Sequence, residues 1–169
     1  ALAELALKDG TDSSFISGLL TSTRNRSGAV LKALASNEQF TSAGSSARAQ
    51  LVKQLAMVVG VRGDIHELAT LLGSLSGEHS SDAAGAWWQA AAISGLGQGL
   101  PRYRGELGRL SLSLLLNNPP DGLKTAAAGL SDLLTQSQKA ALDRNRPAAD
   151  RATAVELLAY RPFDEAAPA

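Results

Sequence analysis

Cysteine is absent from this chain of 169 residues. Its absence excludes disulfide bonds, thiolate zinc sites, cysteine nucleophiles and haem attachment through a CxxCH motif. Aromatic residues make up only 4% of the sequence, so leucine and alanine must supply most of the core. These small and regular side chains favour packed helices over a β-sandwich, which would need more valine, isoleucine, threonine and tyrosine.

The sequence also lacks an excess of either charge. Lysine plus arginine and aspartate plus glutamate number 16 each, so the overall charge gives no attraction to nucleic acid or to anionic lipid. No apolar run reaches the roughly 20 residues of a membrane-spanning helix, and the first residues lack the features of a signal peptide. We therefore expect no nucleic-acid partner and no membrane insertion. Because the chain begins without methionine and ends just after a proline-containing turn, we expect it to be a fragment of a larger protein.

Helical periodicity runs through the whole sequence. Asp64 is placed to cap the helix of the segment DIHELATLLGSL, and Glu67 three residues later completes a pair that resembles a capping box. No run of alternating β-formers competes with this pattern. The apolar residues of the segment recur at spacings of three and four, at Ile65, Leu68, Leu72 and Leu75.

The pattern predicts helices of modest length that are separated by short turns. The turns are marked by stretches rich in glycine, proline and charge, such as TRNRSG, VRGD, LPRYRG and NNPPDG. We expect the tail of a helix at 1–9 and a longer, irregular helix at 121–142. The remaining helices are expected to pair as 12–22 with 27–36, 42–60 with 64–75 and 82–99 with 105–117, while 148–160 begins a further pair.

Helix–turn–helix units that recur every ~40 residues are typical of HEAT and armadillo repeats. One such pair is too thin to bury its own apolar face, so it stacks on the next pair. We therefore predict an all-α fold, a HEAT/armadillo-like right-handed α-α superhelix (solenoid) of about four helix pairs, as a single domain over residues 1–169. A globular helical bundle is the alternative architecture.

Three segments carry a resemblance to a known family: ALAELALKDGTDSSFISGLLTS, RAQLVKQLAMVVGVRGDIHELATLLGSL and, above all, DRNRPAADRATAVELLAYRPFDEAAP. They resemble the HEAT-like repeat region of large secreted planctomycete-type multidomain proteins. In those proteins a membrane-bound-dehydrogenase-like propeller domain and a C-terminal haem-binding cytochrome c domain flank the helices. The resemblance implies a secreted or periplasmic location and a redox role for the parent protein. That chemistry would lie outside this chain, because no CxxCH motif is present.

The two tryptophans are adjacent, at Trp87 and Trp88 in AWWQAAAISGLG. Successive residues of a helix point ~100° apart, so both rings cannot aim at the centre of one interface. The surrounding alanines supply little volume, so one buried ring can fill the gap between neighbouring helices. We expect the other ring at the flank of its helix, where it is available to a partner.

Candidate catalytic and metal-binding groups are few. His66 lies on the polar side of its helix, and GEHSSD brings Glu78, His79 and Asp82 together without the ligand number of a zinc or calcium site. Asp82 is explained as a helix N-cap. No GxSxG motif is present, and GLGQG matches no phosphate-binding spacing and is interpreted as the end of a helix. The sequence predicts no catalytic residue, no metal and no cofactor.

Arginines gather in the turns that we expect within helix pairs, and acidic residues gather in the turns between pairs. Helix capping is the simpler account of this placement. The alternative is a solenoid with a basic edge, including the segment PRYRGELGR, and an opposite acidic edge that includes Glu38 and Asp121. The basic edge would dock an acidic surface of another domain of the chain or of a partner protein. With the tryptophans, the candidate partner-binding residues are Arg24, Arg26, Arg62, Arg102, Tyr103, Arg104, Trp87 and Trp88, and Arg161 lies in a turn of the same type.

Two functions therefore remain open. The first is a non-catalytic scaffold or protein-interaction module. The second is a small helical enzyme of the HEAT-repeat lyase type, which clasps a chromophore or cofactor. The second would need a pocket near Trp87, Tyr103 or His79 on which charged or nucleophilic groups converge.

Overall fold

The computed structural model describes residues 2–9, 13–23, 26–42, 44–76 and 86–160. Within these ranges the chain is helical and contains no strand, so the all-α prediction is confirmed for this part of the chain. The α-helices are α1 (Leu2–Asp9), α2 (Ser13–Ser22), α3 (Ser27–Ala35), α4 (Glu38–Thr41), α5 (Ser46–Arg62), α6 (Ile65–Leu75), α7 (Ala86–Gly99), α8 (Leu112–Asn117), α9 (Lys124–Leu142) and α10 (Ala148–Leu158). Two 3-10 helices, η3 (Leu100–Arg102) and η4 (Asp121–Leu123), accompany them.

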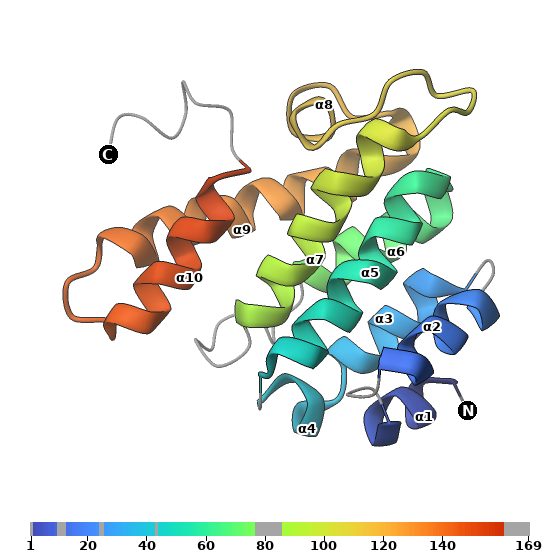
Figure 1. Ribbon diagram of the computed structural model, residues 1–169. Helices are drawn as coiled ribbons and strands as arrows, with labels where there is room; N and C mark the ends of the chain where they lie inside the picture. The colour runs from blue at the N-terminus through green and yellow to red at the C-terminus, as the bar shows by residue number, and fades with distance from the viewer. Residues whose placement is uncertain (1, 10–12, 24–25, 43, 77–85, 161–169) are drawn as a thin grey trace.

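The helices lie in two layers (Figure 1). In one layer α5 and α7 run side by side in the same direction, with α2 against α5 and α10 against α7. In the other layer α3 packs against α6, and α6 packs against α9. Helix α5 makes its most extensive contact with α7. Its contact with α6, the next helix in the chain, is much smaller.

The prediction of a helix over 105–117 holds for residues 112–117 and was wrong for residues 105–111. Only α8 is helical there, because Gly105 and Gly108 precede it and Gly108 adopts a left-handed backbone with φ 73°. Ser111 begins the helix by accepting a hydrogen bond from the Leu114 N–H at 3.0 Å. The helix that follows α6 in the second layer is instead α9, which was predicted as an irregular member, and α9 also packs against α10.

Leucine fills the core between the layers. Leu34, Leu55, Leu71, Leu96 and Leu130, from five different helices, are all 0% exposed. Burying one such side chain contributes about 1.5–3 kcal/mol relative to its exposure. The aromatic-poor composition is thus matched by a core that is mainly aliphatic.

Glycine lets α5 and α7 touch along their backbones. Gly95 and Gly99 lie one turn apart on α7, and a Cβ atom at either position would overlap a carbonyl oxygen of α5, that of Lys53 or that of Met57. Helix α7 ends at Gly99, but Gly95 lies well inside it. The GLGQG segment therefore serves close helix packing in addition to ending the helix.

Asp64 caps α6 as the sequence predicts. Its Oδ1 accepts a hydrogen bond from the Glu67 N–H at 2.9 Å. The capping-box pair is only half formed, because the Glu67 carboxylate is directed to Arg62. Immediately before the cap, Gly63 ends α5 with φ 62°, a conformation that glycine adopts without a steric cost.

We expect Asp64→Ala to lower the free energy of unfolding by about 1 kcal/mol, because the first turn of α6 loses its side-chain acceptor. Asp64→Asn keeps an acceptor in place and should cost less than half as much. Urea denaturation of both variants measures the difference. An equal loss of unfolding free energy in the two variants would show that Asp64 stabilises the protein by something other than capping α6.

Candidate functional site

Three turns lie along one edge of the fold, on the right-hand and upper side of Figure 1. They are the turn before α3, the turn between α5 and α6, and the loop after α7. Contacts connect them: a Cβ atom at Gly28 would lie 3.2 Å from the Glu67 carbonyl oxygen, and Gly63 packs against the ring of Tyr103. We call the residues that these turns bring together the arginine edge: Arg26, Arg62, Arg102 and Arg104. Arg24 and Arg161 lie outside the described residues.

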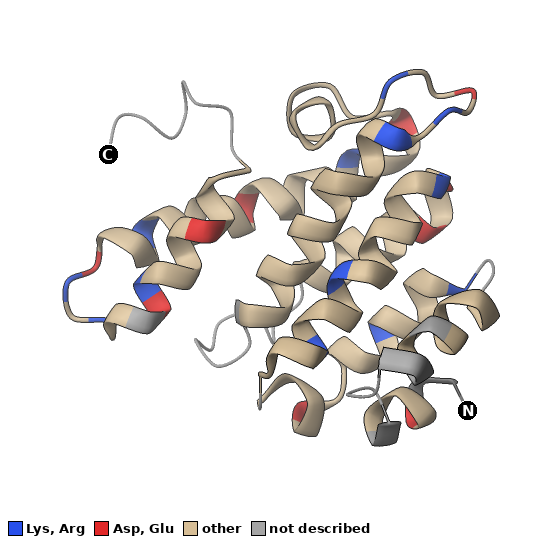
Figure 2. Ribbon diagram, viewed as in Figure 1, with Lys and Arg blue, Asp and Glu red and all other residues tan. Residues whose placement is uncertain are grey.

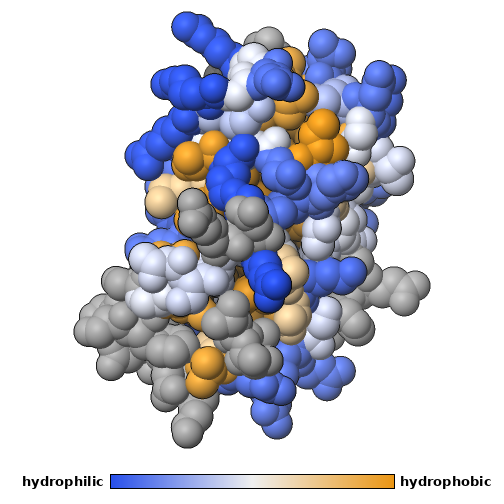
Figure 3. Space-filling view, turned by 90° about the vertical axis from the view of Figure 1, so that its right-hand side faces the viewer, coloured by the Kyte–Doolittle hydropathy of each residue, from blue (hydrophilic) through white to orange (hydrophobic). Residues whose placement is uncertain are grey.

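The arginines of this edge differ in their availability. Arg26, Arg102 and Arg104 are exposed. Arg102 donates from Nη1 to the Met57 Sδ at 3.6 Å, a weak contact that leaves the other donors of the guanidinium without a partner in the described structure. Figure 3 looks onto this edge and shows hydrophilic side chains interspersed with hydrophobic ones.

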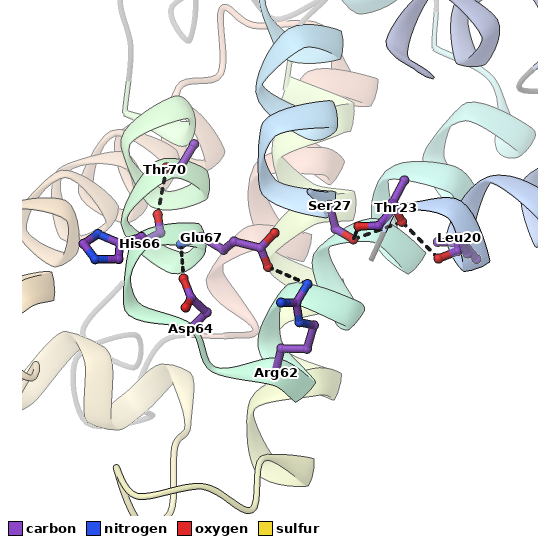
Figure 4. A network of polar contacts seen from close by, with 8 residues as sticks. All are labelled: Leu20, Thr23, Ser27, Arg62, Asp64, His66, Glu67 and Thr70. Carbon is purple, nitrogen blue, oxygen red and sulfur yellow. Dashed lines mark hydrogen bonds and ion pairs between the residues drawn. The ribbon is translucent and has the colours of Figure 1, made fainter. Parts of the chain in front are cut away.

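Arg62 is engaged inside the protein. Its Nη1 lies 3.2 Å from Glu67 Oε2, and the side chains are 29% and 12% exposed. The pair forms no aligned hydrogen bond, and both Glu67 carboxylate oxygens are buried without a hydrogen-bond partner. Figure 4 shows Glu67 on α6 reaching towards Arg62 and towards the buried hydroxyls of Thr23 and Ser27. Arg62 therefore offers less of its charge to a partner than the other arginines of the edge.

Acidic residues also lie on this edge, so the predicted separation of charge was wrong in part. Asp121 was expected on the opposite edge, but it lies on the arginine edge. The next residue, Gly122, contacts Ile65 at the start of α6 and so places Asp121 beside the turn between α5 and α6. Asp121 is paired with Lys124 at 2.6 Å. Helix α4, which carries Glu38, does lie at the far end of the molecule (Figures 1 and 2). Glu78 and Asp82 fall outside the described residues.

The loop 103–111 contains an open pocket of about 730 Å³. Tyr103 lines this pocket, and its hydroxyl accepts a hydrogen bond from the Leu107 N–H at 3.3 Å. Arg104 donates from Nη1 to the carbonyl oxygens of Pro101 and Tyr103, both at 2.8 Å. Arg109 lines the same pocket and was not among the predicted residues, although it is the last arginine of PRYRGELGR.

The two tryptophans differ as predicted. Trp88 is 2% exposed and belongs to the core, where it faces α3 and α6. Trp87 is half-buried, and its Nε1–H donates to the Thr41 carbonyl oxygen at 2.8 Å. The Trp87 ring lies 5.5 Å from that of Phe40, at an angle of 51°. Trp87 is thus held in place by α4, and its polar atom is already satisfied.

Trp87 also forms one wall of a groove of about 580 Å³ between α5, α7 and α10. Ala90 and Ala91 lie along α7 in this groove, with Lys53 on α5 and Tyr160 after α10. Its volume falls within the range of about 300–1,000 Å³ that small-molecule sites occupy. Ser94 is present, but no histidine is among the described residues that line the groove, so the groove itself offers no serine–histidine pair.

The described residues contain no group of three or more histidine, aspartate or glutamate side chains that could hold a metal ion. His66 is exposed, as predicted, and His79 lies outside the described residues. None of the helices in the described part of the chain combines the length and the apolar character that crossing a membrane requires. Comparisons with protein-family models, with curated proteins and with solved structures find no match.

Proposed function

We propose that this chain is a non-catalytic helical-repeat module that binds, through its arginine edge, an acidic surface of another domain or of a partner protein. The observation that carries the proposal is the position of Arg26, Arg102 and Arg104 in turns that lie along one edge. Exposed charges of one sign attract a complementary surface and accelerate its association.

The layered packing supports a HEAT-like solenoid as the architecture of the module. Helices α2, α5 and α7 follow one another in one layer, and α3, α6 and α9 do so in the other. In a solenoid each helix pair contacts only its neighbours, and the turns are presented in rows. Location in a secreted or periplasmic multidomain protein rests on the resemblance of the sequence segments alone.

Charge reversal tests the proposal. We expect Arg26→Glu combined with Arg102→Glu to weaken binding of a polyglutamate peptide about tenfold at low salt, because surface pairs of this kind contribute a few tenths to 1 kcal/mol each. The difference should shrink at high salt. Arg62 is left unchanged, because a glutamate there would face the Glu67 carboxylate. Fluorescence anisotropy with a labelled peptide measures the effect.

The matched control reverses two exposed cations at the other end of the molecule, Lys139→Glu and Arg144→Glu, near the turn between α9 and α10. Both double variants change the net charge equally. If the control weakens binding as much as the edge variant does, the attraction belongs to the net charge and the edge has no special role.

The second candidate function, a small helical enzyme that clasps a cofactor, is favoured by one observation, the groove beside Trp87. Native mass spectrometry of the purified chain separates the two functions. We expect the mass of the polypeptide alone. A stoichiometric organic cofactor that is lost in Ala91→Trp, a substitution that fills the groove, would establish the second function in place of the first.

A further inference from the structure

The pocket of the loop 103–111 is lined by cations and hydroxyls without an acidic residue. Arg104 and Arg109 line it, together with Tyr103 and Ser111, two residues that carry hydroxyl groups. Neither arginine has an ion pair in the described structure, and the one acidic residue of the loop, Glu106, is not among the lining residues. The pocket therefore carries two positive charges that form no ion pair within the described part of the chain.

The hydrogen bonds of Arg104 orient its remaining donors. A guanidinium group has five N–H donors in a planar fork. Both Nη1 hydrogens are used by the carbonyl oxygens of Pro101 and Tyr103. The Nε and Nη2 donors remain, and this side of the guanidinium is the one that can hold two oxygens of an anion at once. Because Nη1 is anchored to the backbone, less side-chain entropy is lost when an anion binds.

Ser111 supplies a neutral donor beside the arginines. Its Oγ accepts the hydrogen bond from the Leu114 N–H at 3.0 Å, so the hydroxyl hydrogen is free to donate. Tyr103 is fixed by its packing against Gly63 and Gly105 and by the hydrogen bond from Leu107. The loop is thus held around a rigid ring.

We propose that this pocket binds a phosphate monoester, held by the free side of Arg104, by Arg109 and by the Ser111 hydroxyl. A phosphate monoester carries about −1.5 to −2 charges near neutral pH, which balances two arginines, whereas a carboxylate or a sulfate ester carries only one. Its three terminal oxygens match the three groups of donors. The pocket lies at one end of the arginine edge, and in this respect alone the phosphate site rests on the proposed function. It specifies the chemical group that this end of the edge recognises.

Isothermal titration calorimetry with short peptides tests the proposal. The probes are one neutral peptide with serine, phosphoserine, sulfoserine or glutamate at its centre, and free phosphoserine. We expect the phosphoserine peptide to bind about tenfold or more tightly than the serine, sulfoserine and glutamate peptides, because only a dianion engages both arginines. Equal binding of the sulfoserine or glutamate peptide would overturn the assignment to phosphate. If free phosphoserine matches the peptide, the ligand is a small phosphate ester; if only the peptide binds, it is a phosphorylated chain.

Variants connect the binding to the pocket. Arg109→Gln removes a charge that forms no ion pair within the described structure, so the fold should be unaffected while phosphopeptide binding falls about tenfold. Arg104→Lys keeps the charge but loses the two-oxygen grip and should weaken binding to a similar extent. Arg144→Gln, outside the pocket, should leave it unchanged. Unchanged binding in Arg109→Gln would overturn the proposal.

The two proposals can fail separately. If Arg26→Glu with Arg102→Glu leaves polyglutamate binding unchanged while Arg109→Gln abolishes phosphopeptide binding, the pocket stands and the edge does not. If Arg26→Glu with Arg102→Glu weakens binding of both the polyglutamate and the phosphoserine peptide, and neither Arg109→Gln nor Arg104→Lys weakens binding of either, the edge acts by general electrostatic attraction alone. The proposed phosphate site is then overturned.

Discussion

Replacing Trp88 by alanine is expected to lower the free energy of unfolding by about 3–5 kcal/mol. The Trp88 side chain is 2% exposed and reaches from α7 towards α3 and α6. There it lines a pocket together with Ala35, Ala69 and Gly73, whose side chains are too small to fill the space that the indole would leave. Because domains of this size are stable by only about 5–15 kcal/mol, the loss would be a large fraction of the total.

The adjacent tryptophan provides the comparison. Trp87→Ala removes a half-buried ring, its contact with Phe40 and one hydrogen bond to Thr41, so the expected cost is smaller than that of Trp88→Ala. Guanidinium denaturation followed by circular dichroism compares the two variants. A larger loss in Trp87→Ala would mean that the ring beside the groove, and not the ring between the layers, holds the fold together.

The helices and their caps could be predicted because the signals are local. Asp64 stands directly before an apolar pattern with a period of 3.6 residues, and Gly63 stands directly after the preceding helix, so both ends of that turn can be deduced from neighbouring residues. The burial of one tryptophan and the partial exposure of the other follow from the geometry of a single helix. Which of the two is buried depends on where α3 and α6 lie, and the sequence does not give that.

The packing of the third helix pair could not be predicted, because it depends on a competition between distant segments. The leucines of SLSLLLN indicate a helix, but Gly105 and Gly108 shorten it to α8, and α9 takes the place beside α6. Ser111 was the available local signal, since serine before a leucine run is a preferred N-cap. The engagement of Arg62 with Glu67 was missed for a similar reason: five positions apart across a turn, they meet only through the angle between α5 and α6.

The direct contact between α5 and α7 gives the other large effect. Gly95→Ala should destabilise the protein by about 1–3 kcal/mol, because the added methyl group would overlap the Lys53 carbonyl oxygen and push the two helices apart. Helix propensity alone predicts the opposite sign, since alanine is favoured over glycine in a helix by about 1 kcal/mol. The sign of the change therefore reports on the contact and not on the helix.

Gly73→Ala is the matched control. Gly73 lies inside α6, and a Cβ atom there would meet nothing within 4 Å. This variant should gain about 0.5–1 kcal/mol from helix propensity and from the reduced freedom of the unfolded chain. Thermal unfolding of the two variants should thus shift the midpoint in opposite directions. If both midpoints rise, α5 and α7 are not in backbone contact, and the layer that presents the turns of the arginine edge is packed differently from the arrangement in Figure 1.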